Sequence, residues 1–149
     1  MKRHEALTTL SREHHQALIL AQLLKKDAPV YKGLPVTVEE KTSYATAFFE
    51  TDLKLHFEKE EMAFALVKTI NRNMGNLVKE LIAEHHNLTA MFYSLAKTAN
   101  PVDAMNTLGE LLSSHIRKEE RVLFPLLEQC CTGVLLTQIG QLLAKKSDQ

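Results

Sequence analysis

Apolar residues recur every three or four positions along most of the chain, which is the period of a helix with one buried face. The first such face consists of Leu7, Leu10, His14, Ala17, Ala21 and Leu24. Pro29, Gly33 and Pro35 follow and predict a loop, because proline and glycine interrupt helices. The chain therefore begins with one helix that ends near residue 24.

A second helix is predicted to begin after Thr37, which forms a capping box with Glu40 three residues later. Its buried face consists of Tyr44, Phe48, Phe49, Leu53, His56, Glu60 and Phe64. The pattern continues to about Thr69, and residues 71–76, with Gly75, predict a break.

Two more long helices are predicted after that break. The third presents Leu77, Leu81, His85, Leu88, Phe92 and Leu95. Asn100 is the expected cap of the fourth helix and Pro101 its first residue. The face of this fourth helix consists of Leu108, Leu112, His115, Glu119, Val122 and Leu126. A second break at residues 132–133 precedes a short helix at about 134–146.

Long helices joined by short loops, with no strand pattern, predict an all-α fold. We expect an antiparallel up-down-up-down four-helix bundle with a short C-terminal helix. The length suits a single domain over residues 1–149. Within it, the bundle would cover about residues 4–128.

Composition and charge exclude several classes of function. The formal net charge is zero, so we expect no nucleic-acid partner and no binding to anionic membranes. No apolar run reaches the roughly 20 residues of a membrane span, and none follows Lys2 and Arg3 as a signal peptide would require. The adjacent Cys130 and Cys131 do not form a disulfide framework. A cytoplasmic location is therefore expected.

The histidines reveal an internal repeat. Glu-His-His occurs at residues 13–15 and again at 84–86. His-x-x-Lys-Glu-Glu occurs at residues 56–61 and again at 115–120. Each half of the chain thus consists of a helix with the first motif, followed by a helix with the second.

The spacing within these motifs has a geometric meaning. His56 and Glu60 lie four residues apart and share a helix face, as do His115 and Glu119. His14 and His85 continue the apolar stripes of the other two helices, although His15 and His86 remain alternatives. Four imidazoles and two carboxylates then converge inside one bundle.

A lone inward histidine is usually a hydrogen-bonded core residue, and a lone histidine–glutamate pair is usually solvated. Two buried carboxylates, however, require cations, because burying each one unpaired costs several kcal/mol. No Lys or Arg is predicted on the inward faces, whereas Glu61 and Glu120 are predicted to point to solvent. The sequence therefore predicts two metal ions, with a bridging carboxylate from each half.

Imidazole and carboxylate ligands suit iron, manganese or zinc. A zinc peptidase would need His-Glu-x-x-His, and a ferritin-like centre would need Glu-x-x-His twice; the chain contains neither motif. No glycine-rich phosphate loop is present either.

Four motifs in this order resemble one known family. His14, His56-x-x-x-Glu60, His85 and His115-x-x-x-Glu119 look like the hemerythrin-like, or HHE cation-binding, domain. The flanking runs at residues 10–15 and 115–125 strengthen the resemblance, which extends over about residues 4–128.

The resemblance implies a bundle with an oxygen-bridged di-iron centre, with manganese or zinc as alternatives. Glu60 and Glu119 would bridge the two ions. His14 and His56 would bind one ion, and His85 and His115 the other. The metal ligands implied are thus His14, His56, Glu60, His85, His115 and Glu119.

Two features depart from the oxygen-carrying hemerythrins. Those proteins have a second histidine on the third helix, where this chain has Thr89. Their last carboxylate lies one residue further on, at the position of Glu120, but the repeat favours Glu119. The loss of a histidine would leave an open position on one iron, so simple reversible oxygen carriage is less expected.

The expected function is therefore to bind or sense oxygen, nitric oxide or a related small ligand. An enzyme that reduces peroxide or nitric oxide or repairs iron centres is one alternative, and a small iron-handling protein is another. A metal-free interaction module is the remaining alternative. The sequence leaves the oligomeric state open.

Overall fold

The computed structural model describes residues 3–147, so the ends of the expected domain, residues 1–2 and 148–149, lie outside the described residues. All its regular elements are helices, and the described part contains no strand. In chain order they are η1 (Glu5–Leu7), α1 (Thr8–Leu23), α2 (Val38–Phe48), η2 (Phe49–Leu53), α3 (Lys54–Val67), α4 (Arg72–Leu95), α5 (Val102–Lys118), η3 (Glu119–Leu123), α6 (Phe124–Cys130) and α7 (Gly133–Ser147).

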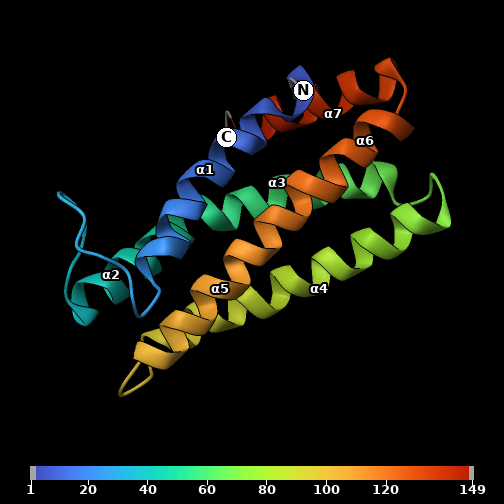
Figure 1. The fold of residues 1–149 in the computed structure, drawn as a ribbon. Coiled ribbons are helices and arrows are strands. Elements are labelled where there is room, and N and C mark those ends of the chain that lie inside the picture. Colours follow the sequence, from blue (N-terminus) through green and yellow to red (C-terminus); the bar gives the residue numbers. More distant parts are fainter. Residues whose placement is uncertain (1–2, 148–149) are drawn as a thin grey trace.

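These helices form the predicted antiparallel four-helix bundle (Figure 1). The short π-helix η2 joins α2 to α3, and the π-helix η3 joins α5 to α6, so α2–η2–α3 and α5–η3–α6 each form one long helical rod. Helices α1 and α4 are the other two rods of the bundle. Each rod packs against two neighbours, in the closed order α1, α3, α4, α5. Helix α7 is the predicted C-terminal helix and packs on α3 and η1. The division into a single domain stays a prediction.

One predicted helix cap, Thr37, is confirmed, whereas two predicted helix starts are shifted. The side chain of Thr37 accepts a hydrogen bond from the backbone N–H of Glu40, which completes the predicted capping box. The predicted break at 71–76 is too long: α4 begins directly after Asn71, whose side chain accepts from the N–H of Met74. Pro101 is the residue before α5 rather than its first residue.

The π-helix η3 changes the face that its rod presents to the core. A π-turn contains one more residue than an α-turn, so it rotates the following residues relative to the preceding ones. Val122, predicted to be buried, is therefore 50% exposed, whereas Leu123 and Leu127 are buried. Both π-turns lie close to site histidines, η2 just before His56 and η3 just after His115.

The core consists of two hydrophobic clusters separated by a polar layer. One cluster includes Leu20, Phe49, Phe92 and Leu112, and the other includes Leu10, Phe64, Leu81 and Phe124. On each rod, the predicted site residues lie at the boundary between the residues of the two clusters. Within residues 3–147, no helix is both long and apolar enough to cross a bilayer.

Gly109 allows α1 and α5 to approach closely. A Cβ atom at this position would lie 2.6 Å from the backbone oxygen of Ala21. We expect Gly109→Ala to lower the free energy of unfolding by about 1–3 kcal/mol, because the backbones must separate, despite alanine's better helix propensity. Urea unfolding measures this, with Gly133→Ala as control, since a Cβ there meets nothing. Equal stability of the two variants would contradict the close contact.

Candidate metal centre

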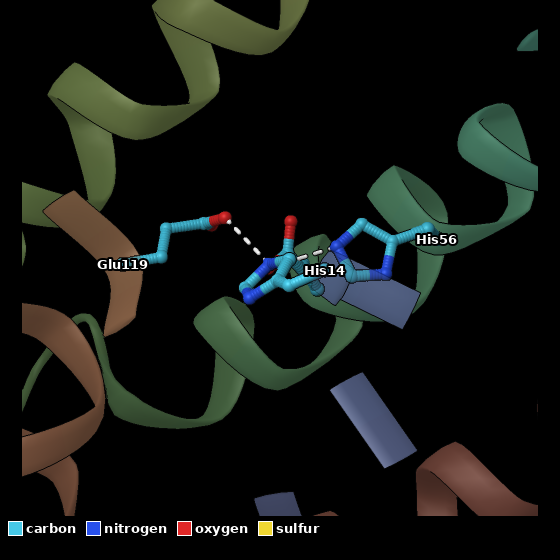
Figure 2. Close-up of side chains that lie close together, drawn as sticks. His14, His56 and Glu119 are labelled. Atoms are coloured by element: carbon cyan, nitrogen blue, oxygen red, sulfur yellow. Dashed lines mark hydrogen bonds and ion pairs between the residues drawn. The ribbon is translucent and has the colours of Figure 1, made fainter. Parts of the chain in front are cut away.

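The structure brings the six predicted site residues together in the middle of the bundle. They are His14 on α1, His56 and Glu60 on α3, His85 on α4, His115 on α5 and Glu119 at the start of η3. All six are buried, and Glu60 and Glu119 are 0% exposed. Figure 2 shows His14 between Glu119 and His56, and these three residues come from three different rods. Their role as metal ligands stays a prediction.

Only one histidine of each His-His pair lies inside the bundle. His14 and His85 are buried in the polar layer, whereas His15 and His86 are exposed. This agrees with the apolar stripes, because a neighbour one residue along a helix points about 100° away.

The two carboxylates lie between two pairs of histidines. Glu60 presents Oε2 to Nε2 of His14 and Nε2 of His56, each at 3.3 Å. Its other oxygen, Oε1, lies 3.1 Å from Nε2 of His85. Each oxygen of Glu60 therefore faces a different half of the repeat, as a bridging carboxylate would.

Glu119, like Glu60, lies close to histidines from both halves of the repeat. Its Oε1 lies 3.1 Å from Nε2 of His14 and 3.2 Å from Nε2 of His115. Its Oε2 lies 3.9 Å from Nε2 of His85. Glu60 and Glu119 thus belong to two overlapping groups of four possible ligands, one with His14 and His56 and one with His85 and His115, each with donor atoms within 4.8 Å of one another.

This donor set fits a pair of metal ions. Two donors that bind one ion at about 2.1 Å and at right angles lie about 3.0 Å apart. The nitrogen–oxygen separations of 3.1–3.3 Å are close to this value. Nε2 of His56, Nε2 of His115 and Oε2 of Glu119 are buried without a hydrogen-bond partner among the described residues. Because such orphaned atoms are costly, their presence together fits a site that binds cations.

Four further carboxylates contact the outer side of the same imidazoles. The Nδ1 atoms of the histidines lie at hydrogen-bond distance from one carboxylate oxygen each. The pairs are His14 with Glu120 at 2.6 Å, His56 with Glu13 at 2.8 Å, His85 with Glu61 at 2.8 Å and His115 with Glu84 at 2.7 Å. We call Glu13, Glu61, Glu84 and Glu120 the outer carboxylates.

This arrangement corrects the prediction that Glu61 and Glu120 only face solvent. Both side chains are partly exposed, at 35% and 27%, but each also contacts a buried histidine of a neighbouring rod. The sequence signal was the identical position of these glutamates in the two copies of the repeat. Helix phase alone could not identify it, because the partner histidine lies on another helix.

A second correction concerns Lys59, since no inward-facing lysine was predicted. Lys59 is 1% exposed, and its ammonium lies 2.5 Å from Glu13. Its counterpart in the repeat, Lys118, pairs in the same way with Glu84. These lysines therefore compensate the charge of two of the outer carboxylates.

The charges around the centre shift the pKa values of its groups. Burial lowers the pKa of His14, but hydrogen bonds to surrounding carboxylates outweigh it and raise the pKa to about 12. The same balance raises the pKa of His85 to about 9. For His115, the charge of Glu119 and hydrogen bonds to Glu119 and Glu84 outweigh burial and raise the pKa to about 10. Burial raises the pKa of Glu60, but the charge of His56 and the histidine hydrogen bonds hold it well below its usual value. Without metal, protonated imidazoles therefore neutralise the buried carboxylates.

Aromatic rings surround the imidazoles and exclude water. Phe57 stacks on His85 with ring centroids 4.0 Å apart, and Phe124 stacks on His14 at 5.4 Å. Phe64 also stacks on His85, with ring centroids 6.0 Å apart. Such dry walls strengthen the attraction between the carboxylates and any bound cation.

Two small pockets reach the outer side of the centre and are related by the repeat. One, of about 170 Å³, is lined by Glu13, Gln16, Phe48, Thr51, Asp52, Leu53, Leu55 and His56. The other, of about 90 Å³, is lined by Glu84, Asn87, Leu88, Leu111, Ser114 and His115. The larger pocket is lined by residues of η2 as well as by His56.

The fold and the site define a class of protein: a four-helix bundle with a buried histidine–carboxylate cluster suited to cations. The family model for the hemerythrin HHE cation-binding domain matches residues 5–127, and the chain therefore belongs to this family. No curated protein matches the chain. No solved structure matches it either.

Proposed function

We propose that this protein holds two iron ions in its polar layer and binds a small ligand such as oxygen or nitric oxide there. Glu60 and Glu119 would bridge the ions. The proposal rests on the two groups of four possible ligands, each of which contains two histidines and both of these carboxylates. The orphaned buried donor atoms within the groups support it independently.

The ligand count supports binding of a small molecule. Two histidines and two shared carboxylates provide each ion with four protein ligands, fewer than the six of an octahedral site. Thr89 does not add a ligand, because its hydroxyl donates to the backbone oxygen of His85 at 2.7 Å. Bound iron would supply the coordination positions and electrons that such a ligand needs, while the aromatic walls exclude water.

Metal content and absorption spectra test this function. Protein purified without added metal, and protein reconstituted anaerobically with Fe(II), should contain about two irons per chain. Oxygen and nitric oxide are then added separately while charge-transfer bands are followed. Bands that appear and are reversed by removing the gas support binding or sensing.

Other outcomes separate the alternatives. Steady consumption of peroxide or nitric oxide above that of free iron would support an enzyme. Iron that a chelator removes within seconds would support iron handling. Fewer than one bound metal per chain after reconstitution would contradict the proposed function.

The open position can be tested by adding a ligand. Thr89 lies one helical turn after His85, so Thr89→His would place a further imidazole beside the ion held by His85 and His115. We expect at least tenfold weaker nitric oxide binding with unchanged iron content. Thr89→Val, which keeps the shape without adding a donor, is the control, and titration followed by absorption is the measurement. Unchanged binding in Thr89→His would show that nitric oxide does not bind at this ion.

A further inference from the structure

The outer carboxylates form a closed ring around the bundle. Glu13 of α1 contacts His56 of α3, and Glu61 of α3 contacts His85 of α4. The next link joins Glu84 of α4 to His115 of α5. Glu120 of η3, in the same rod as α5, contacts His14 of α1 and completes the ring. Each rod therefore contributes one histidine to the centre and one outer carboxylate, which contacts the histidine of a neighbouring rod.

We propose that Glu13, Glu61, Glu84 and Glu120 are positioning residues that set the tautomer of the central histidines and favour the more highly charged state of the bound metal. The inference rests on the proposed metal centre and extends it to residues outside the ligand set. It also explains the glutamates that the repeat places before His14 and His85 and after Glu60 and Glu119.

The chemistry follows from the two nitrogens of an imidazole. A neutral histidine carries one N–H, and the other nitrogen has the lone pair that binds a metal. When a metal ion takes the place of a proton at Nε2, the one remaining proton is held on Nδ1, because Nδ1 of each histidine faces a carboxylate that can only accept. The Nε2 lone pairs are then directed at the centre. The nearby negative charge also makes each imidazole a stronger ligand.

The outer carboxylates are themselves held in place, as accurate positioning requires. Lys59 pairs with Glu13, and Lys118 pairs with Glu84. Glu120 accepts a hydrogen bond from the hydroxyl of Ser11 at 2.8 Å and pairs with Arg3 at 3.4 Å. Glu13, Glu84 and Glu120 therefore each pair with a basic side chain as well as with a histidine.

Glu61 offers the best test, because a matched control lies on the same helix. Glu61→Gln keeps an oxygen that accepts from Nδ1 but removes the charge, whereas Glu61→Ala removes both. Glu58→Gln removes a half-exposed carboxylate of α3 that pairs only loosely with Lys146, at 3.8 Å. The wild type and three variants are loaded with Zn(II) for nitrogen-15 NMR of the histidine tautomers. They are loaded with iron for metal affinity and midpoint potential.

We expect the wild type, Glu58→Gln and Glu61→Gln to keep the Nδ1–H tautomer at His85. Glu61→Gln should lower the affinity for ferric relative to ferrous iron about tenfold, which raises the potential by about 59 mV for one electron. Glu61→Ala should allow the other tautomer and weaken metal binding roughly 10- to 100-fold.

Lower thermal stability in the Glu61 variants, with unchanged tautomer, affinity and potential, would show a merely structural role and overturn the inference. A shift in potential as large in Glu58→Gln as in Glu61→Gln would overturn it too, because the effect would then be one of overall charge. A wild type that binds no metal would overturn the proposed function itself. A wild type that binds metal, with variants indistinguishable from it, would overturn this inference alone.

Discussion

Glu60→Ala is expected to abolish binding of the metal pair, with less than a tenth of the wild-type metal retained per chain. Glu60 belongs to both groups of possible ligands, and its two oxygens face different halves of the repeat. Its removal also takes away one of the two buried negative charges, so the remaining donors attract cations more weakly. Metal analysis after anaerobic reconstitution and gel filtration measures the loss. Glu119→Ala should have a similar effect.

The control for this prediction is Glu58→Ala, which removes an exposed carboxylate from the same helix and should retain full metal content. Glu61→Ala should fall between the two, because it removes the partner of His85 but no ligand. The sequence alone predicted little effect at Glu61, and its contact with His85 changes that expectation. Circular dichroism confirms that each variant is folded. Normal metal content in folded Glu60→Ala would contradict the bridging role.

The central part of this site could be predicted because helix periodicity is local. His56 and Glu60 share a face at a spacing of four, and the repeat transfers that relation to His115 and Glu119. The apolar stripe selects His14 over His15 by the same rule. Since a bundle turns these faces inward, their convergence follows from the fold class alone.

The outer shell could not be predicted in this way, because it depends on contacts between helices. Whether Glu61 meets solvent or His85 is decided by how far α3 is rotated toward α4, and no periodicity within one helix fixes that rotation. Burial of Lys59 follows from the position of Glu13 on another rod. The π-turn η3 was also missed, so Val122 was assigned to the wrong face.

Stability without metal is expected to decrease as the pH rises from 6.5 to above 9. His85 has a pKa of about 9 in the folded protein against an ordinary 6.5, so the folded state holds the proton more tightly. The stabilisation that comes from a raised pKa is fully present below the pKa of the unfolded state. It is lost as the pH rises through the pKa of the folded state. For His85 the contribution is on the order of 3 kcal/mol. His115, with a pKa of about 10, extends the loss further into the alkaline range.

Bound metal should reverse this pH dependence, because an ion at Nε2 replaces the proton there. Urea unfolding of metal-free and Zn(II)-loaded protein at pH 6.5, 8 and 9.5 measures both trends. The stabilisation by metal should grow with pH, since fewer protons must be displaced. His86→Ala, which alters an exposed imidazole, should leave both curves unchanged, whereas His85→Gln should flatten the metal-free curve. Parallel curves with and without metal would mean that protons and metal do not compete for the same nitrogens.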